Sequence, residues 1–255
     1  MSARVIAVSN RKGGTAKTTT TVNLATALGD RGWRVLVVDL DSQGHAGLGF
    51  GVKAAPGQPT VHDVFRGTGA SLADGIRATD YPNVDVLPAD RAFEGPSATV
   101  PPLALASALE PLTGAYRVVL IDTGPTADAL LVSALASAHH VLVPTILHHL
   151  AIDGVGQFAR SFFRVVTSLN AGLHGMSILP VQVDLRVTMQ REILERLAAQ
   201  FGRERLLAGI RPDIALAEAF GRQRPVKYYK PKTRSVEDFE LLCDNVISKI
   251  ITAER

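Results

Sequence analysis

Short runs of consecutive apolar residues, rich in valine, isoleucine and leucine, recur along the chain between longer segments of mixed polarity. Runs of this length, apolar at every position, are typical of parallel strands that are covered on both faces. We therefore predict strands at residues 5–8, 35–40, 84–87, 118–121, 141–143 and 178–183.

The segments between these runs have the apolar spacing of amphipathic helices. The predicted helices are residues 17–29, 127–138, 152–169, 188–201 and 236–253. Strands that alternate with helices indicate an α/β fold, with a doubly wound, mostly parallel sheet and helices on both faces. Residues 51–102 are richer in Gly, Pro and Asp and carry only short elements, and no long linker bounds them. We therefore expect a single domain over residues 1–255.

The polar segment between the first strand and the first helix, residues 9–19, reads SNRKGGTAKTT. A glycine-bearing loop in this place presents backbone N–H groups and a helix N-terminus to an anion. Lys17 is expected to reach the β and γ phosphates of a nucleotide, and the Thr18 hydroxyl to bind Mg²⁺. Arg11 and Ala16 stand where the usual motif has its two glycines. Because the residue before the lysine often has a positive φ, the Ala16 side chain should cost about 1–2 kcal/mol there.

Two predicted strands end in carboxylates. Asp39 and Asp41 are two positions apart at a strand end, so they point to the same side. Asp122 follows the apolar run 118–121, which is the Walker B pattern. We expect Asp122 to hold the magnesium ion, with Thr18 on the other side of the ion.

Several segments resemble one family. The pattern K-G-G-x-x-K-T-T at residues 12–19 resembles the deviant Walker A motif of the ParA/MinD group of P-loop ATPases, usually KGGVGKTT. The pattern D-x-D-S-Q-G at 39–44 is similar to the D-x-D-P-Q-G of that family, with Ser42 in place of proline. Further matches lie at residues 141–157, 210–220 and 230–234, so the resemblance spans nearly the whole chain. It identifies a ParA/Soj-type partition ATPase.

This resemblance implies ATP and Mg²⁺ as cofactors and a homodimer that sandwiches the nucleotide. In it, Lys12 would reach across to the phosphates of the partner subunit, and Asp41, close to the metal, would orient the attacking water. The loop near Arg211 would lie by the adenine. The nucleotide-binding residues implied are Lys12, Gly13, Gly14, Thr15, Ala16, Lys17, Thr18, Thr19, Asp122, Arg211, Pro212 and Asp213. The catalytic residues implied are Lys12, Lys17 and Asp41, and the metal site is Thr18, Asp41 and Asp122.

Charge is unevenly spread along the chain, although the net charge is only +3. Between residues 186 and 234 lie 12 of the 27 Lys and Arg residues, against five acids. A local basic excess favours a polyanion partner, and short ParA relatives bind nonspecific DNA through loops and helix ends of this region. The DNA contacts implied are Arg203, Arg205, Arg222, Arg224, Lys227, Lys230 and Lys232.

The implied function is to partition or position a chromosome, plasmid or protein organelle on the nucleoid, with a ParB-like or cargo-adaptor protein that stimulates hydrolysis. We expect a cytoplasmic protein without an N-terminal helix-turn-helix, since the chain enters its first strand at once. An alternative is a MinD-like membrane-associated regulator of division-site placement. Four acids within residues 236–251 disfavour a helix on an anionic membrane. A second alternative is a small-molecule ligase or kinase on the same fold.

Overall fold

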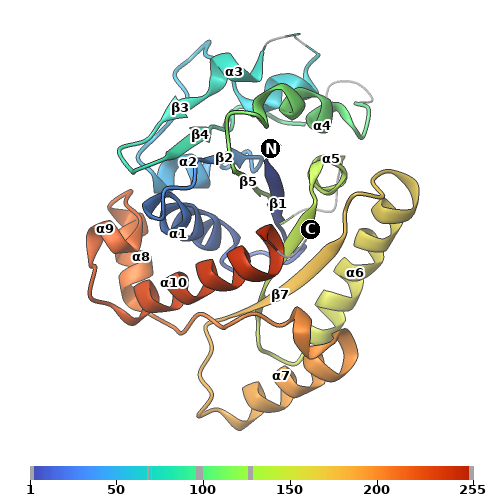
Figure 1. Cartoon of the computed structure of the whole chain (residues 1–255), viewed down its shortest axis with the longest axis vertical. Coiled ribbons are helices and arrows are strands. Elements are labelled where there is room, and N and C mark those ends of the chain that lie inside the picture. The colour runs from blue at the N-terminus through green and yellow to red at the C-terminus, as the bar shows by residue number, and fades with distance from the viewer. Residues whose placement is uncertain (1–2, 68, 70, 96–99, 126–128, 253–255) are drawn as a thin grey trace.

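The computed structural model describes residues 3–67, 69, 71–95, 100–125 and 129–252. A seven-stranded sheet runs through it in the order β3-β4-β2-β5-β1-β6-β7 (Figure 1). All neighbouring strands pair in parallel, except β3, which is antiparallel to β4. The strands are β1 (Arg4–Val8), β2 (Val35–Asp39), β3 (Arg77–Ala78), β4 (Val84–Leu87), β5 (Val118–Asp122), β6 (His140–Ile146) and β7 (Gly175–Val181).

Helices cover both faces of this sheet and pack into two separate cores. One face carries α1 (Lys17–Asp30), α2 (His45–Gly49), α8 (Ile214–Gly221), α9 (Val226–Tyr229) and α10 (Arg234–Val246), which continues into a π-helical turn at Ile247–Ile251. The other carries α3 (Leu72–Gly75), α4 (Ala104–Leu109), α5 (Ala129–Ser137), α6 (Ala151–Ser168) and α7 (Thr188–Phe201). Short 3₁₀ turns lie at Val61–Phe65, Glu110–Leu112 and Arg203–Arg205. The doubly wound α/β prediction is confirmed.

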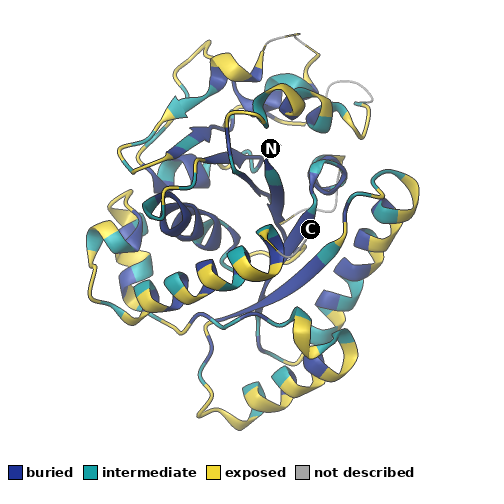
Figure 2. Cartoon of the chain, in the orientation of Figure 1, coloured by how far each residue is buried: buried dark blue, intermediate teal, exposed yellow. Residues whose placement is uncertain are grey.

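Strand β1 explains the continuous apolar runs of the sequence. Val5 and Ala7 point into one core, whereas Ile6 and Val8 point into the other, so the four apolar positions of the strand are all buried. Helix α1 is buried over most of its surface (Figure 2). It contacts strands of the sheet on one side and α10 on the other. The segment that carries the phosphate loop is therefore held by rigid elements.

The predicted strands all form, and β6 is longer than its prediction. Sequence reasoning missed β3, α2, α3, α4, α8 and α9, which are short and lack a long periodic pattern. The predicted helix boundaries at residues 127 and 253 lie outside the described residues. Within the described part of the chain, no helix is both long and apolar enough to cross a membrane.

Candidate nucleotide site

The phosphate loop connects β1 to α1 at the carboxyl end of the sheet. Gly14 has a φ of 73°, and Ala16, the N-cap residue of α1, has φ 61° and ψ 29°. The expected positive φ at Ala16 is therefore confirmed, and its Cβ costs about 1–2 kcal/mol in this conformation. Asn10 anchors the loop, because its amide donates to the Pro144 carbonyl at 2.8 Å and its Oδ1 accepts from the Lys12 N–H at 3.0 Å.

The two lysines of this loop lie in different surroundings. Lys17 is only 7% exposed, and its Nζ donates to the Lys12 carbonyl at 3.2 Å. Burial lowers the pKa of Lys17, while the nearby carboxylates of Asp122 and Asp41 oppose that shift. The Lys12 side chain is exposed, and its Nζ lies 2.5 Å from Nε2 of His148. One lysine thus points into the site and the other points out of it.

Asp122 is fully buried at the end of β5. It accepts hydrogen bonds from the Thr18 hydroxyl at 2.7 Å and from the Thr21 hydroxyl at 3.0 Å. Burial raises the pKa of Asp122 to about 7, although these two hydrogen bonds oppose the shift. Sequence reasoning missed Thr21, which a simple signal could have found: Thr18 and Thr21 are three residues apart and share one face of α1.

Asp39 lies next to Asp122 in the sheet, because β2 and β5 pair in register at these residues. One oxygen of Asp39 accepts the Gly47 N–H at 2.8 Å, and the other has no hydrogen-bond partner among the residues that the structure describes. Burial, followed by the charge of Asp122, raises the pKa of Asp39 well above its usual range. Two buried carboxylates therefore repel each other here, and a hard divalent cation relieves such repulsion.

Asp41 follows β2 and is half-buried. Its Oδ1 accepts the Gln43 N–H at 3.0 Å, and its carbonyl accepts the Gly44 N–H at 2.8 Å, so a tight turn fixes it. A Cβ built on Gly124 would lie 3.5 Å from the Asp41 carboxyl carbon, so these two loops approach each other. The charge of Asp41 also raises the pKa values of Lys17 and Asp122. The predicted site residues Lys17, Asp41 and Asp122 therefore lie close together.

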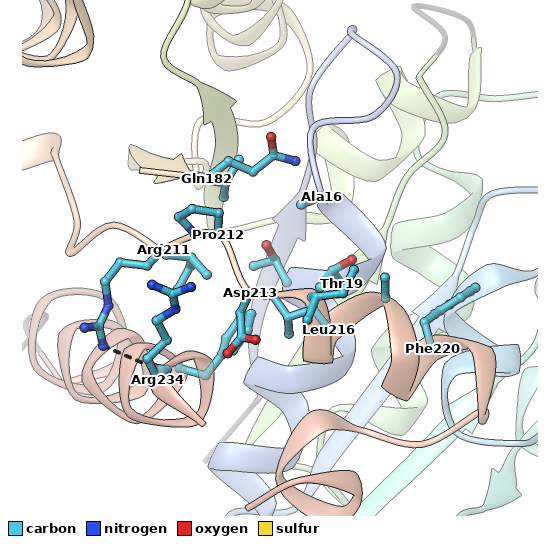
Figure 3. Close-up of a pocket in the computed structure, with 15 residues that line it drawn as sticks. Ala16, Thr19, Gln182, Arg211, Pro212, Asp213, Leu216, Phe220 and Arg234 are labelled. Carbon is cyan, nitrogen blue, oxygen red and sulfur yellow. Dashed lines mark hydrogen bonds between the residues drawn. The ribbon is translucent and has the colours of Figure 1, made fainter. Parts of the chain in front are cut away.

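A cavity of about 690 Å³ opens beside the phosphate loop (Figure 3). Its lining includes all three residues of the predicted adenine loop, Arg211, Pro212 and Asp213. The Arg211 guanidinium pairs with Asp238 of α10 at 2.8 Å, which draws its charged end away from the phosphate loop. Sequence reasoning missed other lining residues, which are Gln182, directly after β7, and Leu216 and Phe220 of α8.

A second cavity, of about 340 Å³, is lined by the phosphate loop itself and by Asp41. Ala16, Thr19 and Phe220 line both cavities, so the two are adjacent. The larger cavity is lined mainly by apolar side chains, and the smaller cavity is rich in backbone N–H groups. Together they have the layout needed for a base and its phosphates.

The predicted DNA contacts fall into two groups. Arg203 and Arg205 lie in the 3₁₀ turn after α7, at the bottom of the view in Figure 1, whereas the others lie around α9, at its left edge. Lys227 is engaged by Asp30 at 2.7 Å and by Glu240 at 2.8 Å, and Arg203 is paired with Glu195. Four exposed basic residues remain near α9, and they are Arg222, Arg224, Lys230 and Lys232.

The fold and this loop define a P-loop nucleotide-binding protein that carries an extra lysine at the start of the loop. A family model described as AAA domain matches residues 3–174. Chromosome partitioning protein ParA of Caulobacter vibrioides (strain NA1000 / CB15N) is 34% identical over 253 residues, which cover 96% of this chain and 94% of the relative. Sporulation initiation inhibitor protein Soj of Bacillus subtilis (strain 168) is 32% identical and covers 92% and 94%. The chain belongs to this family of ParA/Soj-type P-loop ATPases.

Solved structures agree with this assignment. The cell division ATPase MinD of Pyrococcus furiosus is 28% identical, with a TM-score of 0.82, and the match covers 96% of this chain and 99% of that chain. A protein described as cobyrinic acid a,c-diamide synthase from Mycobacterium smegmatis, with bound ATP analog and magnesium, is 31% identical. Its TM-score is 0.79, with 96% of this chain and 95% of that chain covered.

Proposed function

We propose that the chain is a cytoplasmic, Mg-ATP-dependent dimerisation switch that binds nonspecific DNA and positions a cargo on the nucleoid. A ParB-like or cargo-adaptor protein would stimulate hydrolysis and so release the dimer. The ParA and Soj relatives support this proposal, since the first is named for chromosome partitioning. Hydrolysis works as a release step because the dimer is more stable with ATP than with ADP.

The observation that carries the proposal is the different placement of the two lysines of the phosphate loop. Lys17 already supplies an inward cation to the phosphate loop of its own chain. Lys12 stands at the outer edge of that loop, and no carboxylate among the described residues pairs with it. An exposed ammonium beside a phosphate site is available to the nucleotide of a second copy, where it would neutralise developing charge.

The residues present suit ATP and magnesium. The loop N–H groups, the N-terminus of α1 and Lys17 would hold the phosphates, and the Thr18 hydroxyl and Asp122 would face the metal. Bound magnesium would supply positive charge to the β and γ phosphates. The fit rests on the buried carboxyl groups of Asp39 and Asp122, which lie side by side, so that the charge of Asp122 raises the pKa of Asp39.

Asp41 is proposed to orient the attacking water. Its carboxylate is held by the Gln43 N–H, next to Gly124, and it is within the electrostatic reach of Lys17. Asp41→Ala should keep ATP binding and dimerisation but slow hydrolysis. We therefore expect a long-lived ATP dimer that stays on DNA.

Four exposed basic residues near α9 carry the DNA part of the proposal: Arg222, Arg224, Lys230 and Lys232. Contacts from Arg and Lys to phosphates need no base readout, and their strength falls steeply with salt. Tyr228 takes a structural role here, because its hydroxyl donates to Asp30 at 2.7 Å and its ring packs on Tyr81.

The MinD-like membrane alternative has less support. The apolar face of α10 consists of Phe239, Leu242 and Val246, and each of these is at most 3% exposed. This face packs against α1 within the fold, so it is not presented to a bilayer.

A small-molecule ligase is the second candidate, and one further cavity favours it. This cavity, of about 380 Å³, is lined by Asp39 on one side and by Lys53 and Arg91 at its rim. The similar M. smegmatis protein is described as a cobyrinic acid a,c-diamide synthase. Release of ADP that depends on added cobyrinic acid, without DNA or partner protein, would support this candidate, whereas the partition proposal expects no such dependence.

The test of the proposed function compares nucleotide states. Wild-type protein should be a monomer that leaves a nonspecific DNA duplex free with Mg-ADP, and a dimer that binds it with Mg-ATP. Anionic vesicles should not sediment the protein in either state. Equal DNA binding with ADP and ATP, or vesicle binding in place of DNA binding, would contradict the proposal.

The DNA surface is tested by the double variant Arg224→Glu and Lys230→Glu, with Arg160→Glu on α6 as an exposed control. The double variant should dimerise normally. Its plot of log affinity against log salt should be shallower than that of wild type by about two, because each phosphate that a side chain neutralises contributes about 0.9 to the slope. If the slope of log affinity against log salt is unchanged, then the region around α9 does not contact DNA.

A further inference from the structure

The contact between Lys12 and His148 poses a problem of hydrogen bonding. His148 lies between β6 and α6, and its two ring nitrogens both have neighbours. Nε2 lies 2.5 Å from the Lys12 ammonium, and Nδ1 is 3.0 Å from the Leu150 N–H, which points at it. A neutral imidazole has one N–H and one acceptor nitrogen. The ring therefore cannot accept from Lys12 and from Leu150 at the same time.

One of the two hydrogen bonds must be lost, and their relative strengths decide which one. If Nδ1 accepts from Leu150, Nε2 carries a hydrogen that faces the ammonium, and the bond from Lys12 is lost. If Nε2 accepts from Lys12, the bond from the Leu150 N–H is lost instead. A hydrogen bond from an ionised donor is roughly twice as strong as one from a neutral donor, so losing the Leu150 bond costs less and changes an equilibrium by only about three- to tenfold. The favoured arrangement therefore has Nε2 accepting from Lys12 and the proton on Nδ1.

The ring must be neutral for this role, and its surroundings keep it so. Burial and the charge of Lys12 lower the pKa of His148, and His149 acts in the same direction. A protonated ring would have no acceptor and would repel the ammonium. At neutral pH, His148 is therefore an acceptor with two competing donors.

We propose that His148 is a positioning residue that holds the Lys12 ammonium in the unassembled subunit and releases it to the phosphates of a second copy. The proposal rests on the role of Lys12 in the dimer proposed above. When Lys12 leaves, Nδ1 gives its proton to water and Nε2 takes one from water. Nδ1 then accepts from Leu150, the N-cap residue of α6. The position of Lys12 is thus coupled to the first turn of α6.

The first test uses the full-length, nucleotide-free protein, so it does not depend on a dimer. In protein with ¹⁵N-labelled histidine, long-range proton–nitrogen spectra report the tautomer of each ring, and His148→Asn identifies the signal of His148. We expect the Nδ1–H tautomer in wild type and about a tenfold change in the tautomer ratio towards Nε2–H in Lys12→Ala, with His149 unchanged. Equal tautomer ratios in wild type and Lys12→Ala would overturn the proposal.

The second test measures the ATP concentration that gives half-maximal dimer. His148→Ala should need about three- to tenfold less ATP than wild type, because Lys12 is no longer held. His148→Gln keeps an acceptor oxygen and should restore the wild-type value, and His149→Ala serves as the adjacent control. If His148→Ala needs the same or more ATP, then His148 does not restrain Lys12. Failure of wild type to dimerise would contradict the proposed function, and the tautomer ratio would still decide the role of His148.

Discussion

Replacing Ala16 with glycine should stabilise the protein. Ala16 has φ 61° and ψ 29°, where a side chain costs about 1–2 kcal/mol relative to glycine. Glycine also loses more backbone freedom on folding than alanine, which costs about 0.5–1 kcal/mol. The net expectation is a gain of about 0.5–1 kcal/mol for Ala16→Gly. With an unfolding entropy of about 2 cal/mol/K per residue, this corresponds to a rise in Tm of roughly 1–2 °C for a chain of this length.

Thermal and urea unfolding without nucleotide measure this effect directly. Ala25→Gly is the matched control, because Ala25 lies within α1, the helix that Ala16 caps, and is fully buried. That change should destabilise by at least about 1 kcal/mol. If Ala16→Gly lowers stability as Ala25→Gly does, then the backbone at residue 16 is not strained in the free protein.

Two further predictions concern the parts of the chain that frame the site. The hydrogen bonds to Asp213 from Ala215 and Ser235 lower its pKa despite the opposing effect of burial. Its stabilisation is therefore present above the unfolded value of about 3.9 and is lost as pH falls through the folded value. Asp213→Ala should lower the free energy of unfolding by about 1–2 kcal/mol at pH 7. Urea titrations should show that this loss of stability becomes smaller below about pH 4. A loss that does not change with pH would contradict the role given to the Asp213 carboxylate. Burial raises the pKa of Cys243 to about 11, so iodoacetamide at pH 8 should label this thiol only when the protein unfolds. Anionic vesicles and Mg-ATP should not change this result. Rapid labelling in the presence of vesicles would mean that α10 leaves the fold.

The parts of the fold that sequence reasoning predicted are those with strong local signals. Strands such as β1 and β5 are buried on both faces, so their apolar runs are unbroken and easily recognised. Helix α8 was missed because it is short, and its place is fixed by tertiary contacts and by the Asp213 cap. The positive φ of Ala16 was predicted, because the place of a residue before the motif lysine constrains its backbone.

The candidate site was only partly predictable. The residues around the phosphates follow each other closely in sequence or end a strand, so a motif finds them. The lining of the larger cavity also includes Gln182, directly after β7, and Leu216 and Phe220 of α8, and only the fold brings these two segments to the phosphate loop. The contact between Lys12 and His148 joins residues that are 136 positions apart, and neither residue type alone signals it.

The measurement that tests the central claim most directly is the molar mass of Lys12→Ala in Mg-ATP, determined together with its affinity for ATP. Light scattering should show wild type as a dimer and Lys12→Ala as a monomer at the same ATP saturation, because in the proposal Lys17 binds the nucleotide of its own chain. Lys17→Ala, as the companion variant, should lose ATP binding itself. A Lys12→Ala protein that binds ATP and forms a normal dimer would contradict the role of Lys12 in the second subunit.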